Sequence, residues 1–200
     1  MKAVVTRVNS ASVSIDGSVC GRIGKGFLIL LGVAPEDTPE KCRKLAEKIL
    51  GLRVFRDEND KMNLSLSDVG GEVLVVSQFT LYGDVSHGRR PSFIGAGKPD
   101  IAIPLYEQFL SECERLGFPP QHGEFGAYMQ VASENDGPVT LIVDTNDRKY
   151  AQRIFSVGSA LHRLDVHTIR LRPRAFFRRK ISRCCTLSVF YFLKSERNSI

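Results

Sequence analysis

The chain has 200 residues, enough for one domain with a sizeable hydrophobic core or for one domain and an appendage. Its net charge of +6 divides unevenly: residues 1–146 hold 15 Lys and Arg against 19 Asp and Glu, a net −4, whereas residues 147–200 hold 13 against 3, a net +10. The basic character therefore gives no reason to classify the body of the chain as a nucleic-acid-binding protein.

The five cysteines have neither the spacing of a metal site nor that of a disulfide framework; they are Cys20, Cys42, Cys113, Cys184 and Cys185. We therefore expect reduced thiols, a cytoplasmic protein, and no metal ion or cofactor. No apolar run approaches the roughly 20 residues that a membrane helix needs, and the amino terminus lacks a secretory signal. We expect no membrane partner.

The amino-terminal part of the body predicts antiparallel strands. Residues 2–23 alternate apolar and polar side chains around Asp16-Gly17, a dipeptide typical of a type I′ hairpin turn. Residues 27–33 predict a buried strand. Because Gly24 and Gly26 lead into this strand and not into a helix, they do not predict a phosphate-binding loop.

Two helices are predicted among the strands. The first begins at Thr38-Pro39, which supplies a capping hydroxyl and an N1 proline, and it ends at Gly51. The second covers residues 103–116 and has Pro104 in its first turn. Further strands are predicted at residues 52–55, 73–76, 128–132 and 139–143. These elements predict an α+β domain, an antiparallel-rich sheet or barrel with two main helices packed on it.

Polar side chains follow the buried strand at residues 73–76, whose valines and leucine are typical of a strand covered on both faces. Ser77, Gln78 and Thr80 come at its carboxyl end. Such groups are either hydrogen-bonded within the fold or in contact with a ligand, and the local pattern leaves both interpretations open.

The usual signatures of hydrolases are missing from the body. It has neither a nucleophile elbow nor a metal-binding histidine pair, and its only histidines are His87 and His122. A triad assembled in space from either histidine stays open. Residues 87–93 predict a loop whose two arginines and phenylalanine suit phosphate and base contacts, or simply a solvated loop.

Two blocks of sequence resemble the D-aminoacyl-tRNA deacylase family: residues 77–81, SQFTL, and residues 135–140, NDGPVT. The resemblance extends over about residues 1–145. It includes shorter matches at Arg7-Val8, residues 61–63, residues 90–93 and residues 129–131.

The resemblance implies a homodimeric enzyme that hydrolyses the ester between a D-amino acid, or glycine, and the 3′ end of tRNA. It implies a catalytic segment made of Ser77, Gln78, Phe79 and Thr80, in which the backbone N–H groups of Phe79 and Thr80 form an oxyanion hole. Since an aminoacyl ester is already activated, positioning and an oxyanion hole can accelerate its hydrolysis. No general base stands beside Thr80, so we expect this residue to bind or orient substrate.

Gly137-Pro138 alone would predict a simple turn between strands. The resemblance implies instead a cis bond whose two carbonyls enter the active site of the partner subunit and exclude L-aminoacyl groups. A filter of this kind cannot reject glycine. The resemblance also implies that Arg7 braces these carbonyls across the interface and that Phe125 and Met129 line a pocket for the terminal adenine.

The family pattern ends near residues 143–145. We therefore expect a deacylase domain at residues 1–146 and a basic extension at residues 147–200, either poorly ordered or non-native, for example from a shifted reading frame. A tRNA-binding arm is the other interpretation of the extension. The alternative function for the whole chain is a non-catalytic nucleic-acid-binding protein that binds through this tail.

Overall fold

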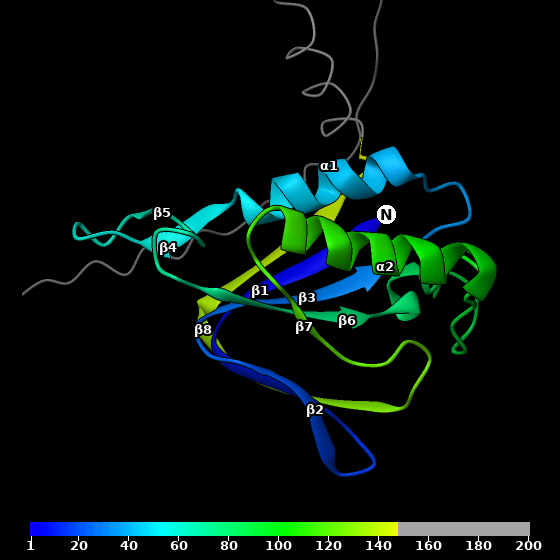
Figure 1. The fold of residues 1–200 in the computed structure, drawn as a ribbon. Coiled ribbons are helices and arrows are strands. Elements are labelled where there is room, and N and C mark those ends of the chain that lie inside the picture. Colours follow the sequence, from blue (N-terminus) through cyan, green and yellow to red (C-terminus); the bar gives the residue numbers. More distant parts are fainter. Residues whose placement is uncertain (148–200) are drawn as a thin grey trace, which may run out of the picture. The chain divides into compact units, whose positions relative to one another are not determined.

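The computed structural model describes residues 1–147, so the predicted basic extension lies outside the described residues, apart from Asp147. A six-stranded sheet has the order β2-β1-β3-β6-β7, and β8 pairs with β1 (Figure 1). Its strands are β1 (Lys2–Ile15), β2 (Ser18–Ile23), β3 (Gly26–Gly32), β6 (Glu72–Ser77), β7 (Gln121–His122) and β8 (Met129–Asp144). A separate hairpin consists of β4 (Arg53–Arg56) and β5 (Met62–Ser65).

The predicted opening hairpin is confirmed. Asp16 and Gly17 connect β1 to β2 with φ angles of 50° and 80°, as a type I′ turn requires. Gly26, where β3 begins, lies so close to β6 that a Cβ atom would stand 1.9 Å from the carbonyl oxygen of Glu72. This glycine therefore serves close strand packing, which agrees with the absence of a phosphate loop.

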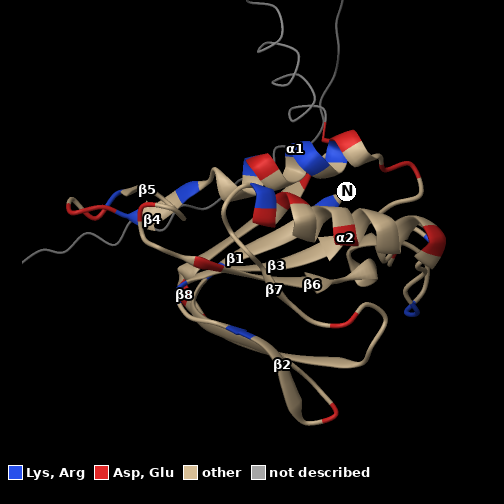
Figure 2. Cartoon of the chain, viewed as in Figure 1, with Lys and Arg blue, Asp and Glu red and all other residues tan. Residues whose placement is uncertain are grey.

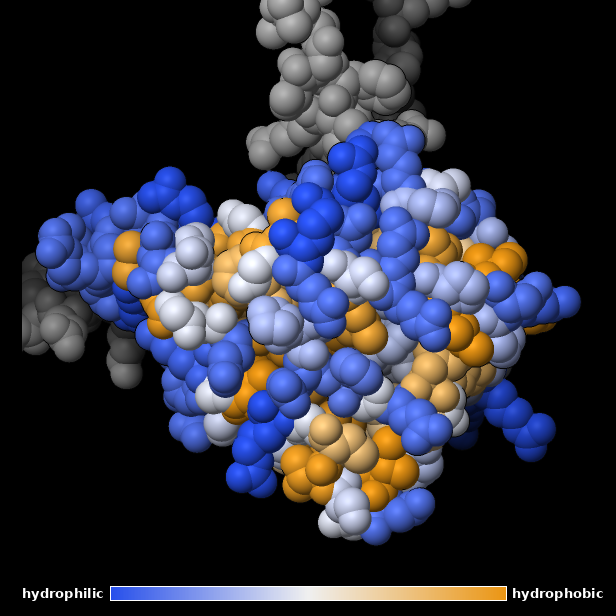
Figure 3. Space-filling model, viewed as in Figure 1, coloured by the Kyte–Doolittle hydropathy of each residue, from blue (hydrophilic) through white to orange (hydrophobic). Residues whose placement is uncertain are grey.

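Helices α1 (Pro39–Leu50) and α2 (Pro99–Arg115) cover one face of the sheet (Figure 1). Thr38 caps α1 as predicted, because its hydroxyl accepts a hydrogen bond from the N–H of Lys41. Both helices carry residues of both charges (Figure 2), and the face of the molecule seen in Figure 3 is mainly hydrophilic with scattered hydrophobic patches. No helix within residues 1–147 is long and apolar enough to cross a membrane.

The predicted start of α2 is wrong by four residues. The helix begins at Pro99, which takes the N-terminal position expected of Pro104, and Pro104 lies inside the helix. The error has a physical origin: both prolines are compatible with a first turn, and the residues between them, among them the buried Ala102 of the main core, continue the helix back to Pro99.

The sheet is covered on both faces along β6, as predicted. Val73 and Val75 belong to the main core beneath the helices, whereas Leu74 and Val76 belong to a second core with Val13 on the opposite face. All four residues of β6 between Val73 and Val76 are at most 2% exposed. Residues that follow this strand are therefore positioned by a rigid support.

One prediction about the sheet is wrong. The strands predicted at residues 128–132 and 139–143 form one strand, β8, whose pairing with β1 shifts register around Arg7. The expected antiparallel-rich sheet is confirmed, because β1 pairs antiparallel with β2, β3 and β8, although β6 is parallel to both β3 and β7. The fold is thus α+β with two helices on a mixed sheet, in which β1 pairs with β2, β3 and β8.

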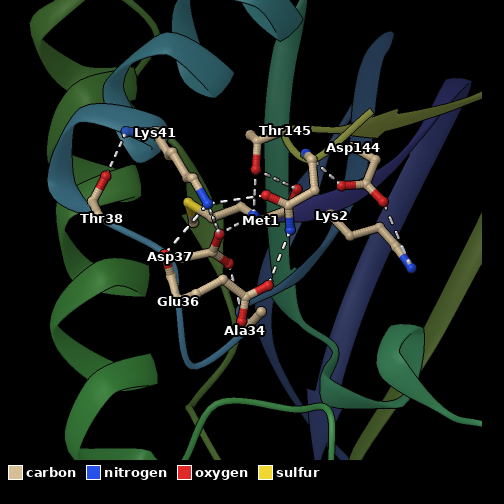
Figure 4. Close-up of polar contacts among 10 residues, drawn as sticks. Met1, Lys2, Ala34, Glu36, Asp37, Thr38, Lys41, Asp144 and Thr145 are labelled. Carbon is tan, nitrogen blue, oxygen red and sulfur yellow. Dashed lines mark hydrogen bonds and ion pairs between the residues drawn. The ribbon is translucent and has the colours of Figure 1, made fainter. Parts of the chain in front are cut away.

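The amino terminus is held inside the molecule (Figure 4). The ammonium group of Met1 forms a buried ion pair with Asp37, and it also donates to the hydroxyl of Thr145. The N–H of Thr145 returns a hydrogen bond of 2.9 Å to the Met1 carbonyl. These contacts join the start of β1 to the end of β8. Burial lowers the pKa of the ammonium group, whereas Asp37 opposes this shift.

Candidate active site

The segment that follows β6 turns directly into a short 3-10 helix, η1 (Phe79–Tyr82). Ser77 pairs with Leu31 of the parallel strand β3, and the N–H of Gln78 donates 2.7 Å to the Leu31 carbonyl. The sheet therefore holds the backbone up to Gln78. Beyond this residue the chain leaves the ladder, and η1 begins.

The first N–H groups of η1 are available to a ligand. Among residues 1–147, no hydrogen bond holds the backbone N–H of Phe79 or of Thr80, because a 3-10 helix leaves its first donors without internal acceptors. Both are the donors expected to form an oxyanion hole. The amide of Gln78 donates to the hydroxyl of Thr80 and fixes it in place.

A cavity of about 230 Å³ lies at this end of β6. Ser77, Gln78 and Phe79 form one wall. Residues 125–129 form another, and this wall includes the predicted adenine-binding residues Phe125 and Met129. The structure thus brings together five of the predicted site residues, while Thr80 lies next to the cavity without lining it.

Helix α2 supplies a third wall, which the sequence did not predict to be part of a site. Tyr106 lines the cavity, donates its hydroxyl to the Val75 carbonyl at 3.0 Å and contacts the ring of Phe125 at 5.8 Å. Burial raises the pKa of Tyr106 to about 12, so it stays neutral at physiological pH. Its role in the cavity is that of a supporting wall.

Tyr128 is a second cavity residue that sequence reasoning missed. Its side chain lines the cavity and is 88% exposed. A large aromatic ring that meets solvent at the edge of a cavity is a typical contact for a planar ligand. The sequence predicted only that Tyr128 begins a strand, and this does not indicate whether its side chain lines a cavity.

Arg7 and residues 136–138 lie apart from this cavity, none of them among its lining residues. Arg7 is 1% exposed, and its Nη1 donates to the carbonyl of Val54. Its Nε forms an ion pair with Asp136 Oδ2 at 2.8 Å. The geometry of this contact is not that of a hydrogen bond, so the buried Nε has no hydrogen-bond partner among the described residues. The Gly137-Pro138 peptide bond is cis, the geometry that the family resemblance implied, and both residues are exposed.

The two histidines do not build a triad. His87 Nδ1 lies 2.7 Å from the hydroxyl of Ser86, and His122 Nδ1 lies 2.8 Å from the carbonyl oxygen of Gly123. Neither ring contacts Ser77 or Thr80 in the described part of the chain. Residues 1–147 also contain no group of three His, Cys, Asp or Glu side chains that would hold a metal ion.

Sequence comparisons match the body of the chain. The model of the D-Tyr-tRNA(Tyr) deacylase family covers residues 4–144. A protein of Desulfatibacillum aliphaticivorans named D-aminoacyl-tRNA deacylase is 59% identical over 145 residues, which cover 72% of this chain and 99% of that protein. The protein of the same name from Thermosipho africanus is 54% identical over 145 residues and is covered to 97%.

Solved structures show the same fold. A protein titled c-Myc DNA Unwinding Element Binding Protein is 44% identical, with a TM-score of 0.68 over 72% of this chain and 98% of that one. A probable eukaryotic D-amino acid tRNA deacylase reaches a TM-score of 0.63 over the same shares at 18% identity, which is evidence for the fold alone. On the family model and the curated relatives together, the chain belongs to the D-Tyr-tRNA(Tyr) deacylase family.

Proposed function

We propose that the chain hydrolyses the ester that links D-amino acids, and glycine, to the 3′ end of tRNA, and that the cavity at the end of β6 is its active site. The observation that carries this proposal is the pair of unbonded N–H groups at Phe79 and Thr80, next to a largely apolar cavity. Donors in such surroundings stabilise the oxyanion of a tetrahedral intermediate more strongly than water does.

The chemistry requires only a water molecule and a positioned ester. The water oxygen attacks the ester carbonyl carbon, and the carbonyl oxygen takes up negative charge between the N–H groups of Phe79 and Thr80. The adjacent ribose hydroxyl of the terminal adenosine assists this attack. The bond to the ribose oxygen then breaks, this oxygen takes up the proton that the attacking water has lost, and the products are the free amino acid and tRNA.

The terminal adenine is assigned to the wall formed by residues 125–129. Phe125 and Met129 line the cavity together with Phe79 and offer an aromatic ring and a polarisable thioether. Stacking of a base on such a surface contributes roughly 1–3 kcal/mol. This arrangement leaves the ester between the adenine and the oxyanion donors.

The chiral filter is assigned to a second copy of the chain. Gly137 and Pro138 are exposed on β8 and do not line the cavity of their own chain. Within residues 1–147, β8 pairs with β1 alone, so its other edge is open, and Ile142 on it is 73% exposed. Such an edge suits a two-fold interface. In the dimer, carbonyls of the partner's Gly137 and the partner's Pro138 occupy the space that the Cβ of an L-residue needs.

The deacylase domain is assigned to residues 1–146, and residues 147–200 to a basic extension beyond it. The matched relatives support this boundary, since 145 aligned residues account for 97% or more of two of them. We assign the enzyme to the cytoplasm, where aminoacyl-tRNA is made and used. The alternative of a non-catalytic nucleic-acid-binding protein is not favoured, because relatives more than half identical carry the name of the enzyme.

Hydrolysis of D-Tyr-tRNA and L-Tyr-tRNA by the full chain, measured side by side, tests the proposal. We expect release of D-tyrosine and no release of L-tyrosine above the rate without enzyme. Gln78→Ala should lower the rate by about tenfold, because Gln78 orients Thr80 beside the oxyanion donors. The matched variant is Gln108→Ala on α2, which removes only a hydrogen bond to the Pro39 carbonyl at the start of α1 and should keep the rate of the unaltered chain. Equal hydrolysis of both substrates, or of neither, would refute the function.

A further inference from the structure

An ordered loop projects from the wall of the candidate active site. The backbone groups of Asp84 and Ser92 exchange two hydrogen bonds, of 2.7 and 2.9 Å, and thereby close the loop formed by residues 85–91. The Asp84 carboxylate also accepts from the N–H of Ser86. Immediately after the loop, the ring of Phe93 packs edge-on against Phe79 with centroids 5.1 Å apart. The loop is therefore fixed to a residue that lines the cavity.

The tip of this loop carries two unpaired cations. Most basic side chains of the body are held by carboxylates, carbonyls or aromatic rings, as Arg7, Arg53 and Arg115 illustrate. The lysines and arginines without such a contact inside residues 1–147 are Arg22, Lys48, Lys61, Arg89, Arg90 and Lys98. Three of these six follow the catalytic segment within one short stretch, and the basic tip of the loop is blue in Figure 2.

This grouping contrasts with the rest of the body. Residues 1–146 have a net charge of −4, which repels a polyanion. Binding of a nucleic acid by this surface therefore requires a local excess of positive charge next to the site where its end is held. Arg89 and Arg90 are exposed and lie on the loop beside Phe79, whereas Lys98 follows the cavity residue Gly97.

We propose that Arg89 and Arg90 bind phosphates of the single-stranded 3′ end of the tRNA and guide its terminal adenosine into the cavity. This inference rests on the proposed function, because it takes the ester-bearing nucleotide to lie in that cavity. Guanidinium groups suit the recognition of phosphate oxygens, and backbone contacts position a nucleic acid without reading its sequence. The two hydrogen bonds at the base of the loop keep the arginines in place before tRNA arrives.

Two variants of the full chain test this role. Arg89→Ala/Arg90→Ala removes the proposed phosphate contacts, whereas Arg22→Ala/Lys61→Ala removes the same charge from β2 and from the turn before β5. Neither change touches the backbone hydrogen bonds of the loop, so both variants should unfold at the temperature of the unaltered chain. Each is assayed on D-Tyr-tRNA and on 3′-D-tyrosyl-adenosine, which has the ester and the adenine but no phosphate.

The loop variant should lose roughly 3- to 10-fold in kcat/KM for D-Tyr-tRNA at low salt and keep its rate on D-tyrosyl-adenosine. The slope of log Kd for deacylated tRNA against the logarithm of the salt concentration should fall by about 1.4. Each contact with a single-stranded phosphate contributes about 0.7, and the variant removes two such contacts. The control variant should show smaller changes in both kcat/KM for D-Tyr-tRNA and the salt slope of tRNA binding. Arg89→Lys/Arg90→Lys should restore most of the slope.

Other outcomes overturn the proposal. If the loop variant and the control variant have equal slopes and equal kcat/KM for D-Tyr-tRNA, the arginines contribute only general charge. If the loop variant loses the same factor on D-tyrosyl-adenosine, the loop acts on the cavity and not on the tRNA backbone. Failure of the unaltered chain to cleave D-Tyr-tRNA refutes the proposed function itself, and the salt slope of tRNA binding still measures the role of the loop.

Discussion

Arg7 Nη2 lies 2.8 Å from the point where a Cβ atom on Gly137 would stand. Gly137 also has a φ of +116°, a conformation that residues with a side chain rarely adopt. The buried guanidinium of Arg7 is held by Val54 and Asp136, so it has little freedom to move away. Any side chain at position 137 must therefore displace either the arginine or the exposed Gly137-Pro138 segment.

We expect Gly137→Ala to impair both stability and chiral discrimination. The strained backbone and the contact with Arg7 should cost about 1–3 kcal/mol of unfolding free energy. Displacement of the proposed filter should lower the ratio of D-Tyr-tRNA to L-Tyr-tRNA hydrolysis by about tenfold, or roughly 1.4 kcal/mol. Urea denaturation and paired deacylation assays measure the two effects.

Gly70→Ala provides the control for this variant. Gly70 also has a positive φ, +59°, but a Cβ atom there meets no atom within 4 Å. The Gly70→Ala variant should lose about 1–2 kcal/mol of unfolding free energy from backbone strain and keep the full ratio of D-Tyr-tRNA to L-Tyr-tRNA hydrolysis. A Gly137→Ala enzyme with the ratio of the Gly70→Ala enzyme would show that position 137 has no part in discrimination.

A second prediction concerns the buried amino terminus. The ammonium group of Met1 and the carboxylate of Asp37 are both fully buried, and Asp37 also accepts from the N–H of Ala34 at 2.7 Å. Asp37→Asn keeps the shape of the side chain but leaves a buried positive charge uncompensated. We expect a loss of about 3–5 kcal/mol in unfolding free energy, measured by urea denaturation.

The pH dependence of Asp37→Asn follows from the lowered pKa of the Met1 amine. Burial lowers this pKa below its ordinary value of 8.0, and loss of Asp37 should lower it further. Between the lowered pKa of the folded chain and pH 8.0, the unfolded chain binds more protons than the folded one, so stability falls as the pH drops through this window and recovers toward pH 8.0. Glu36→Gln, which removes a carboxylate that accepts from Asn146 near the surface, should show neither effect.

The sequence predicted local features well where a residue type has one dominant structural use. Asp16-Gly17 predicted a type I′ turn and Thr38-Pro39 a helix start, because positive φ and capping are set by the residues themselves. The buried strand at residues 73–76 was equally clear. The importance of Ser77, Gln78 and Thr80 was not: it came from the family resemblance, since the local pattern left their role open.

Features that depend on distant contacts escaped sequence reasoning. The single strand β8 was predicted as two, because its residues 136–139, which include Gly137-Pro138, have no partner on β1 and shift the register there. Tyr106 joined the cavity wall because α2 packs over β6, and Tyr128 because residues 125–129 fold over the same cavity. No periodicity within either segment encodes these tertiary relations.

A third prediction concerns thiol reactivity. Burial raises the pKa of Cys42 and of Cys113 to about 12, whereas Cys20 is exposed on β2. Because the thiolate is the reactive form, iodoacetamide should alkylate Cys20 in the native protein and spare the two buried thiols. The thiols of Cys42 and Cys113 should react only after the protein unfolds in urea, at the rate of that unfolding. Peptide mass spectrometry measures the alkylation of each cysteine. Rapid native alkylation of Cys113 would contradict the packing of α2 against α1.

The last prediction addresses whether Thr80 attacks the ester. Its hydroxyl accepts a hydrogen bond from the Gln78 amide, and the described residues place no carboxylate, imidazole or amine in contact with it. Without a base to take its proton, a threonine hydroxyl is a weak nucleophile. We therefore expect Thr80→Ala to retain measurable hydrolysis of D-Tyr-tRNA, with a loss of about tenfold to a hundredfold from poorer orientation.

Thr80→Ser separates the two roles of this hydroxyl. Serine keeps the acceptor for Gln78 and should restore most of the rate, which fits orientation and attack equally well. Acid quenching of the unaltered enzyme during turnover of D-Tyr-tRNA then distinguishes them, because only attack leaves tyrosine covalently bound to the peptide that contains Thr80. We expect no such adduct by mass spectrometry. Its detection, together with complete inactivity of Thr80→Ala that still binds tRNA, would make Thr80 the nucleophile.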